Sequence, residues 1–151
     1  MKRIRIVYLL PELKWGGSEK HVIQLASGLR QRGHEVRIVC LFREGPLAGE
    51  GREKGIPFTC LNLPYRWGLR TLLGIRDWIR SNPMDILHTY LFGFHLFAGL
   101  PARLLKVPRV LSSRRDVDTG QRHRDLWIER LGNLFVDRVV CCAKAAERWV
   151  L

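Results

Sequence analysis

The amino-acid sequence predicts an α/β protein with a Rossmann-like, doubly wound, mostly parallel six-stranded sheet. Apolar runs rich in valine and isoleucine alternate with amphipathic helical patterns along the chain. The 151 residues suggest one domain, with enough chain to cover both faces of a sheet. The hydrophobic fraction of 46% and the charged fraction of 26% exclude a disordered, collagenous or coiled-coil chain.

The first 42 residues predict a strand, a loop, a helix and a second strand, which is the βαβ unit of a parallel sheet. The first strand covers residues 3–10, and a loop ending in Gly16 and Gly17 follows it. Ser18 is the expected N-cap of the helix, and Gly33 suits its C-terminal end. The second strand covers residues 36–42. The apolar positions of the helix share one face: Val22, Leu25, Ala26 and Leu29.

The same alternation continues to the end of the chain. Further helices are predicted over residues 46–54, 69–81, 92–106, 122–135 and 143–151. Further strands are predicted over residues 58–63, 85–90, 109–113 and 138–142. In the helix over 122–135, four apolar side chains are expected to face inward: Trp127, Leu131, Leu134 and Phe135. The cysteines lack C-x-x-C spacing and are expected to be reduced and mostly buried: Cys40, Cys60, Cys141 and Cys142.

Charge is the unusual feature of the composition. The 26 Lys and Arg residues against 14 Asp and Glu give a formal net charge of +12. This excess predicts an anionic partner: nucleic acid, acidic lipid, a phosphorylated ligand or an acidic companion domain. Nucleic acid is the least favoured, because no helix-turn-helix, RRM or zinc motif is present. The dispersed histidines and cysteines predict no metal site.

No run of apolar residues is long enough to cross a membrane. The longest weakly polar run, residues 91–102, contains His95 and Pro101, and the first apolar run stops at Pro11, too early for a signal peptide. The chain is therefore expected in the cytoplasm, with peripheral attachment to the inner face of the membrane as an option. The basic residues after position 100 are either a solvated face or such an attachment surface.

Ligands of doubly wound sheets bind beyond the carboxyl ends of the strands. This rule selects residues 11–17, the stretch after His88, and residues 114–120. Gly16 and Gly17 could bring backbone amides to a phosphate at the positive end of a helix, or could serve only a tight turn that needs a positive φ. The full G-x-G-x-x-G dinucleotide fingerprint is absent, which argues against NAD.

Four segments of the sequence resemble the family-4 glycosyltransferases, which are retaining enzymes of the GT-B fold. The first, G-G-S-E-K-H-V-I-Q-L-A-S-G-L-R-Q-R-G-H-E-V, lies at a predicted strand–helix junction. The other three are D-I-L-H-T, V-L-S-S-R-R-D and D-R-V-V-C-C-A-K-A-A. These segments begin at Gly16, Asp85, Val110 and Asp137, in the family's order, so the resemblance covers essentially the whole chain.

The resemblance implies that residues 1–151 form the N-terminal, acceptor-side half of a GT-B fold. The donor-binding C-terminal domain is expected to be absent from this chain, which alone is expected to be inactive. The intact enzyme would transfer a sugar from a nucleotide-diphosphate sugar to a hydroxyl acceptor, a glycan or a lipid-linked molecule, with retention. No cofactor and no metal are expected. The partners are then the donor, the acceptor, the missing domain and an anionic membrane surface.

The resemblance also assigns the candidate site residues. Gly16 and Gly17 would bind the donor diphosphate. Arg114 would replace a histidine found in many members; it stays protonated and could hold a phosphate, and Asp116 could accept a proton. The alternative for this pair is a solvated loop with an ion pair worth about 0–1 kcal/mol. Acceptor contacts are expected from Trp15, Glu19, His88, Tyr90 and Arg115.

Simpler structural roles compete with several of these assignments. Glu19 could be an ordinary first-turn acid, and His88 could be a satisfied core histidine, with Tyr90 better placed to reach the cleft. Two other functions also stay open for the whole chain. One is a non-catalytic basic module that docks on an anionic membrane or on a separate donor-binding subunit. The other is a nucleotide-binding Rossmann protein unrelated to sugar transfer.

Overall fold

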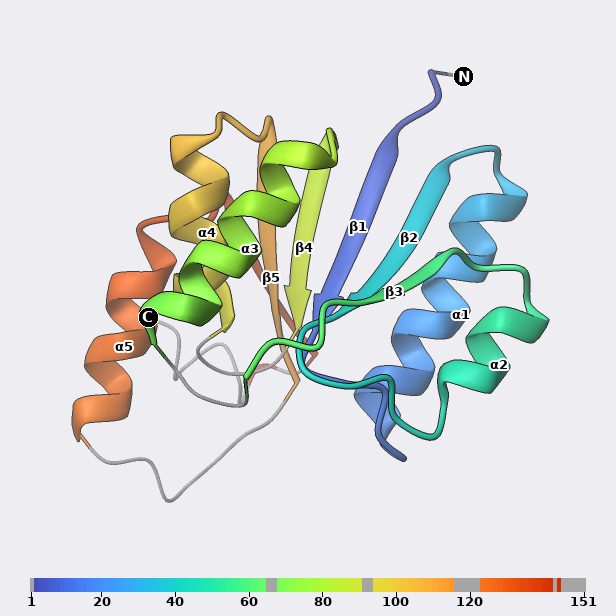
Figure 1. The fold of residues 1–151 in the computed structure, drawn as a ribbon, viewed down its shortest axis with the longest axis horizontal. Helices are drawn as coiled ribbons and strands as arrows, with labels where there is room; N and C mark the ends of the chain where they lie inside the picture. The colour runs from blue at the N-terminus through green and yellow to red at the C-terminus, as the bar shows by residue number, and fades with distance from the viewer. Residues whose placement is uncertain (1, 65–67, 91–93, 116–122, 143, 145–151) are drawn as a thin grey trace.

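The computed structural model describes residues 2–64, 68–90, 94–115, 123–142 and 144 (Figure 1). The strands are β1 (Arg5–Leu10), β2 (Glu35–Cys40), β3 (Phe58–Cys60), β4 (Ile86–Tyr90), β5 (Arg109–Arg114) and β6 (Arg138–Cys141). The helices are α1 (Gly17–Gln31), α2 (Ala48–Glu53), α3 (Leu69–Ser81), α4 (Phe94–Leu104) and α5 (His123–Asn133). The predicted alternation of strands and helices is confirmed, although the helix expected over 143–151 falls almost entirely outside the described residues.

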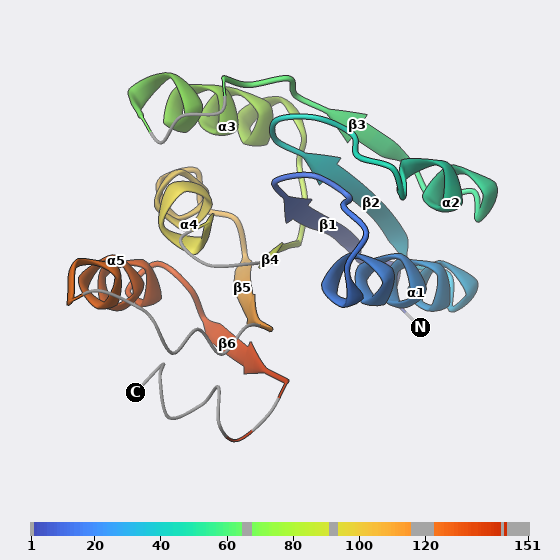
Figure 2. The same cartoon turned by 90° about the horizontal axis from the view of Figure 1, so that it is seen from below.

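The six strands form one sheet in the order β3-β2-β1-β4-β5-β6, and every pairing in it is parallel. Helices α1 and α2 cover one face, and α3, α4 and α5 cover the other (Figure 2). The predicted doubly wound α/β fold is therefore confirmed. The strand order reverses between β1 and β4, so the carboxyl ends of these two strands border the crevice where such sheets bind ligands.

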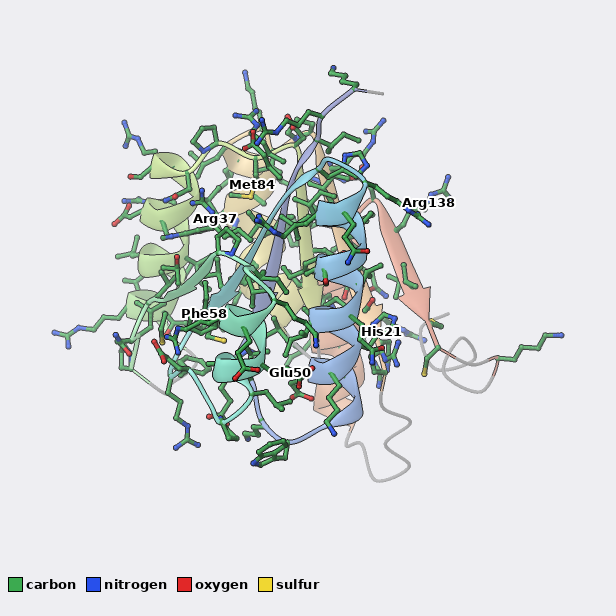
Figure 3. All side chains as sticks on the ribbon, turned by 90° about the vertical axis from the view of Figure 1, so that its right-hand side faces the viewer. His21, Arg37, Glu50, Phe58, Met84 and Arg138 are labelled. Atoms are coloured by element: carbon green, nitrogen blue, oxygen red, sulfur yellow. The ribbon has the colours of Figure 1, made fainter. Side chains whose placement is uncertain are left out.

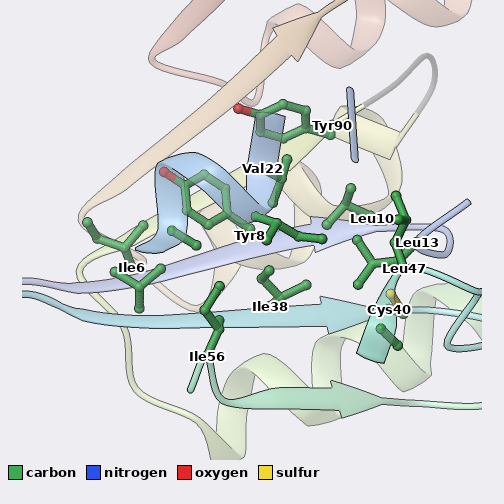
Figure 4. Packing of buried hydrophobic residues seen from close by; sticks show 14 residues of the cluster. Ile6, Tyr8, Leu10, Leu13, Val22, Ile38, Cys40, Leu47, Ile56 and Tyr90 are labelled. Atoms are coloured by element: carbon green, nitrogen blue, oxygen red, sulfur yellow. The ribbon is translucent and has the colours of Figure 1, made fainter. Parts of the chain in front are cut away.

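Alternation of side chains along β1 supplies both cores. Tyr8 and Leu10 pack with Val22 of α1 and Ile38 of β2 on one face (Figure 4). Leu9, the residue between them, joins the core under α3 and α4 on the opposite face. A parallel strand covered on both faces needs a continuous apolar run, and β1 has one.

The start of α1 differs from the prediction and its end agrees with it. Gly16, with an extended backbone, is the N-cap and makes no side-chain capping bond, so the expectation of a Ser18 cap was wrong. At the other end, Gly33 has a φ of 88° and donates its amide to Arg30 O at 2.9 Å. The His34 amide donates to Leu29 O at 3.2 Å, which completes a Schellman motif.

Helix α5 is rotated relative to the prediction. Trp127 is 70% exposed and Leu134 is 73% exposed, so these side chains do not face inward. The buried side of the helix instead carries Gly132, where a Cβ would collide with the His95 ring of α4. The missing side chain lets α5 approach α4 closely. Of the four residues predicted to face inward, Phe135, just beyond the helix, does lie against Gly99 of α4. Leu131 is also exposed, at 49%.

The cysteines were predicted to be mostly buried, and this was wrong. All four thiols are free, but only Cys40 is buried, because it lies on β2, an interior strand of the sheet. Cys60 and Cys141 lie on the edge strands β3 and β6 and are partly exposed, and Cys142 is exposed. Among the described helices, none combines the length and the apolar character that a membrane span requires.

Candidate functional site

The candidate site lies at the carboxyl ends of the strands, where the chain leaves β1 and enters α1. Gly16 has a φ of −155°, and Gly17 is not among the residues with positive φ. A turn that needs a positive φ therefore does not explain this glycine pair. Open space surrounds the Cβ position of Gly17, at the start of α1, so a side chain there would meet no neighbouring atoms.

The backbone of Gly16 lies against the side chain of Glu19. A Cβ at position 16 would collide with the Glu19 carboxylate, which lies against the backbone of its own helix start. Glu19 is only 6% exposed. Its charge complements the positive end of α1, as expected for an acid in the first turn. The carboxylate is thus held beside the glycine pair and has little surface free for an acceptor.

Trp15 is 73% exposed and directly precedes the glycine pair. The Lys20 ammonium lies 5.9 Å from the centre of its ring, which is within the range of a cation–π contact. An exposed aromatic ring beside an open helix start can stack on a sugar. The expectation that Trp15 lines the cleft agrees with this position, and the contact with an acceptor stays a prediction.

A buried carboxylate near this loop was missed by the sequence analysis. Glu12 is 3% exposed and pairs with Lys14 Nζ at 2.7 Å and with the guanidinium of Arg43. The side chains of Lys14 and Arg43 are 55% and 70% exposed, so Glu12 fixes two cations at the rim of the carboxyl edge. Its place two residues after β1 was the available signal, because that edge is where ligands bind.

Aromatic and imidazole rings pack together on the face of the sheet beside α1. The centroid of the His88 ring lies 5.3 Å from that of the Tyr8 ring and 4.8 Å from that of the Tyr90 ring. Tyr90 is fully buried, so the expectation that it reaches the cleft more readily than His88 was wrong. The physical reason is the ring cluster, in which Tyr8 and α1 cover the Tyr90 side chain.

His88 is a buried, neutral histidine. It is 7% exposed, its Nε2 lies 2.8 Å from Ser113 Oγ, and burial lowers its pKa from 6.5 to about 4. These surroundings support a structural role for His88, as a core histidine with a satisfied hydrogen bond. Ser113 was not identified from the sequence; the register of β4 and β5 pairs it with Tyr90, two residues beyond His88 on the same face.

His21 extends the cluster toward solvent. Its Nδ1 lies 3.4 Å from the Tyr90 hydroxyl, and Figure 3 shows it on α1. Burial, and then the charge of Arg115, lower the pKa of His21. Burial raises the pKa of Tyr90, and Arg115 opposes that rise. The structure thus brings His21, Tyr90 and Arg115 together, and a ligand that reached this group would meet one arginine and a neutral imidazole.

Arg114 is not part of a solvated loop. It is the last residue of β5, is 6% exposed, and its carbonyl accepts the Cys142 amide at 3.3 Å. Arg115 follows as a partly buried residue. Asp116 lies outside the described residues, so the predicted pairing of an arginine with this acid stays a prediction. The buried position of Arg114 argues against the exposed ion pair considered above.

The parallel sheet and the glycine pair at its carboxyl edge define a Rossmann-like α/β domain with a helix N-terminus at its ligand-binding end. The chain belongs to Glycosyltransferase Family 4, whose model matches residues 15–151. It forms an N-terminal domain of the GT-B type, as the resemblance of the four segments implied. The family assignment is therefore confirmed.

Known proteins agree with this assignment. Over 80 residues the chain is 30% identical to a phosphatidyl-myo-inositol mannosyltransferase of Mycolicibacterium smegmatis, a match covering 50% of this chain and 21% of that protein. HepE of Anabaena, solved with UDP, has a TM-score of 0.78 and 15% identity over 97% of this chain and 40% of its own. MurG of Acinetobacter baumannii has a TM-score of 0.69 and 15% identity, and the match covers 94% of this chain and 42% of MurG. The chain thus spans less than half of each relative.

Proposed function

We propose that this chain is the acceptor-side domain of a retaining glycosyltransferase, which moves a sugar from a nucleotide-diphosphate sugar to a hydroxyl acceptor. The observation that carries the proposal is the uncovered glycine position 17 at the start of α1, in a chain of Glycosyltransferase Family 4. Helix N-termini attract phosphate because their amides and their dipole both favour a negative charge. HepE, which shares the fold, was solved with UDP.

The donor diphosphate would approach Gly16 and Gly17 from across the cleft. The family members are longer than this chain, and we propose that a second Rossmann-like domain supplies most of the donor site. During transfer the bond between the anomeric carbon and the diphosphate breaks, and the acceptor oxygen bonds to that carbon on the same face. The acceptor proton passes to the leaving phosphate, so the reaction needs no enzyme nucleophile and, in this proposal, no metal or cofactor.

The remaining predicted residues would act on the acceptor side. Trp15 would stack on a sugar ring, and Arg115 would contact a charged or polar group of the acceptor. Arg114, which is also largely buried, would stabilise the diphosphate charge from the end of β5 without direct contact, and Asp116 would orient the acceptor hydroxyl. Glu19 and His88 would position other groups rather than touch the acceptor, because both are largely buried.

Binding and turnover by the 151-residue chain test the proposal. UDP and GDP, added to ¹⁵N-labelled protein, are expected to shift the Gly16 and Gly17 amide resonances at millimolar concentration. A Gly17→Asp variant places a negative charge at the helix start and should abolish these shifts, while Gly28→Asp, at an open site within the same helix, should keep them. Absence of shifts at both glycines in the unmodified chain contradicts the donor site.

Catalysis in this proposal needs both halves of the cleft, because donor and acceptor must be oriented together. The chain alone, incubated with a panel of UDP- and GDP-sugars and hydroxyl acceptors, is expected to release no nucleotide above the background. Rapid transfer by the chain alone would overturn the half-enzyme proposal and leave the donor-site proposal intact.

A second candidate function is a basic module that docks on an anionic membrane. Two observations favour it: the net charge of +12 and the match to a mannosyltransferase whose name contains a phosphatidyl lipid. Each Lys or Arg near an acidic surface contributes about 1 kcal/mol. Sedimentation with phosphatidylserine vesicles and with neutral vesicles tests the module, and equal binding to both kinds of vesicle argues against it.

A further inference from the structure

A cavity of about 620 Å³ opens at the end of the sheet opposite the candidate site. It is bordered by the amino-terminal ends of β1 and β2, by the turn after α1, and by the turn after α3. Figure 3 places Arg37 and Met84 toward this end and His21 toward the other. The cavity is therefore separate from the carboxyl edge, where the family's sugar chemistry is proposed.

Arginines dominate the polar lining of this cavity. Arg3, Arg5, Arg30 and Arg37 all line it, against Glu35 as the acid. Carboxylates compensate two of the four guanidinium groups. Arg3 pairs with Glu35 at 2.9 Å, and Arg5 forms two side-chain hydrogen bonds to Asp85, of 3.0 and 3.3 Å.

No described carboxylate forms an ion pair with the other two arginines, Arg30 and Arg37. Arg37 donates from Nη1 to the neutral amide oxygen of Asn82 at 2.8 Å, and no described carboxylate lies within ion-pair distance of it. Arg30 has no ion-pair partner among the described residues and lies in the last turn of α1. The neighbouring His34 also lines the cavity, and its buried Nδ1 atom has no hydrogen-bond partner.

We propose that this arginine-lined cavity binds a phosphorylated ligand, with Arg30 and Arg37 as its main contacts. Two uncompensated guanidinium groups match the several oxygens of a phosphate or diphosphate, because each guanidinium can donate two parallel hydrogen bonds. Apolar residues of β1 and β2, together with Pro57 and Pro83, also line the cavity and suit the uncharged part of a phosphate ester.

Titration of the ¹⁵N-labelled 151-residue chain with inorganic pyrophosphate at 150 mM NaCl tests this proposal. Saturable shifts are expected at the Gly33 and His34 amides, which border the cavity. This readout separates the cavity from the proposed donor site, whose reporters are the amides of Gly16 and Gly17. A parallel arm uses phosphatidylcholine vesicles with and without phosphatidic acid, and shows whether a lipid headgroup or a free phosphate ester is the preferred source.

Paired variants separate a built site from general basic charge. R30Q/R37Q should weaken pyrophosphate binding at the cavity by about tenfold or more. R32Q/R70Q removes the same net charge from exposed positions outside the cavity and should change the affinity less than twofold. Equal losses in both double variants would overturn the proposal, as would an absence of binding in both the pyrophosphate and the vesicle arms.

A variant that should bind more tightly complements the double variants, because misfolding can explain a loss of binding but not a gain. Glu35→Gln frees Arg3 from its ion pair, so pyrophosphate binding at the cavity should strengthen by about two- to threefold. Glu53→Gln, at an exposed position of α2, raises the net charge equally and is the matched control. If the control gains as much affinity as Glu35→Gln, the cavity is not the binding site.

Discussion

Acidification should destabilise this domain through His88 before it affects the paired carboxylates. His88 is buried and its pKa is lowered from 6.5 to about 4. Between these values the unfolded chain takes up a proton that the folded chain does not, so the free energy of unfolding falls as the pH falls. One pKa unit corresponds to about 1.4 kcal/mol, which gives a full loss of about 3 kcal/mol and about 2 kcal/mol by pH 5.

Urea unfolding at pH 7.5 and pH 5.0 measures this loss, and a His88→Gln variant assigns it. The variant should lose most of the pH dependence, with the remainder assigned to His21, whose lowered pKa acts in the same direction. His34→Gln, in the turn after α1, should keep the full dependence. Asp85 and Asp137 do not interfere, because their lowered pKa values confine their effect to pH below 3.8. The reasoning is refuted if the unmodified chain is equally stable at both pH values, or if His88→Gln keeps the full dependence.

Two further predictions concern stability. Asp137 accepts a hydrogen bond of 2.7 Å from the Val110 amide of β5 and one of 2.8 Å from Arg103 of α4. In urea titrations, Asp137→Asn should therefore lower the free energy of unfolding by about 2 kcal/mol. The control Asp77→Asn, at an exposed position, should change it by less than about 0.5 kcal/mol. Gly132→Ala should cost about 1–3 kcal/mol in the same assay because its Cβ would collide with His95; Gly28→Ala, in open space, should stabilise by about 0.5–1 kcal/mol.

Element order was readable from the sequence because strands covered on both faces and amphipathic helices leave clear patterns. The orientation of α5 was not. Trp127 and Leu131 are four residues apart, the spacing of a buried helix face, yet both are exposed. What decided the orientation was the absence of a side chain at Gly132, which permits the contact with His95. A pattern of apolar residues records which side chains are available for burial, but not how closely two helices approach.

Some features of the candidate site were also predictable from the sequence, and others needed the structure. The place of Gly16 and Gly17 followed from the chain order and the edge rule. The contact between Gly16 and Glu19 needed coordinates, because it depends on where the carboxylate folds back. The contact of His88 with Ser113 links residues 25 positions apart and depends on strand register. Local sequence carries little information about such cross-strand contacts.

The two phosphate sites proposed here should act independently. Strand β1 has six residues, which at about 3.3 Å each separate its ends by roughly 20 Å. The Debye length at physiological ionic strength is about 8 Å, so exposed charges at one end of the sheet are largely screened from the other. R30Q/R37Q should therefore leave the UDP-dependent shifts at Gly16 and Gly17 unchanged. Long-range attraction from the net charge of +12 predicts the opposite, a parallel weakening at both ends, so the same titrations distinguish two local sites from one diffuse basic surface.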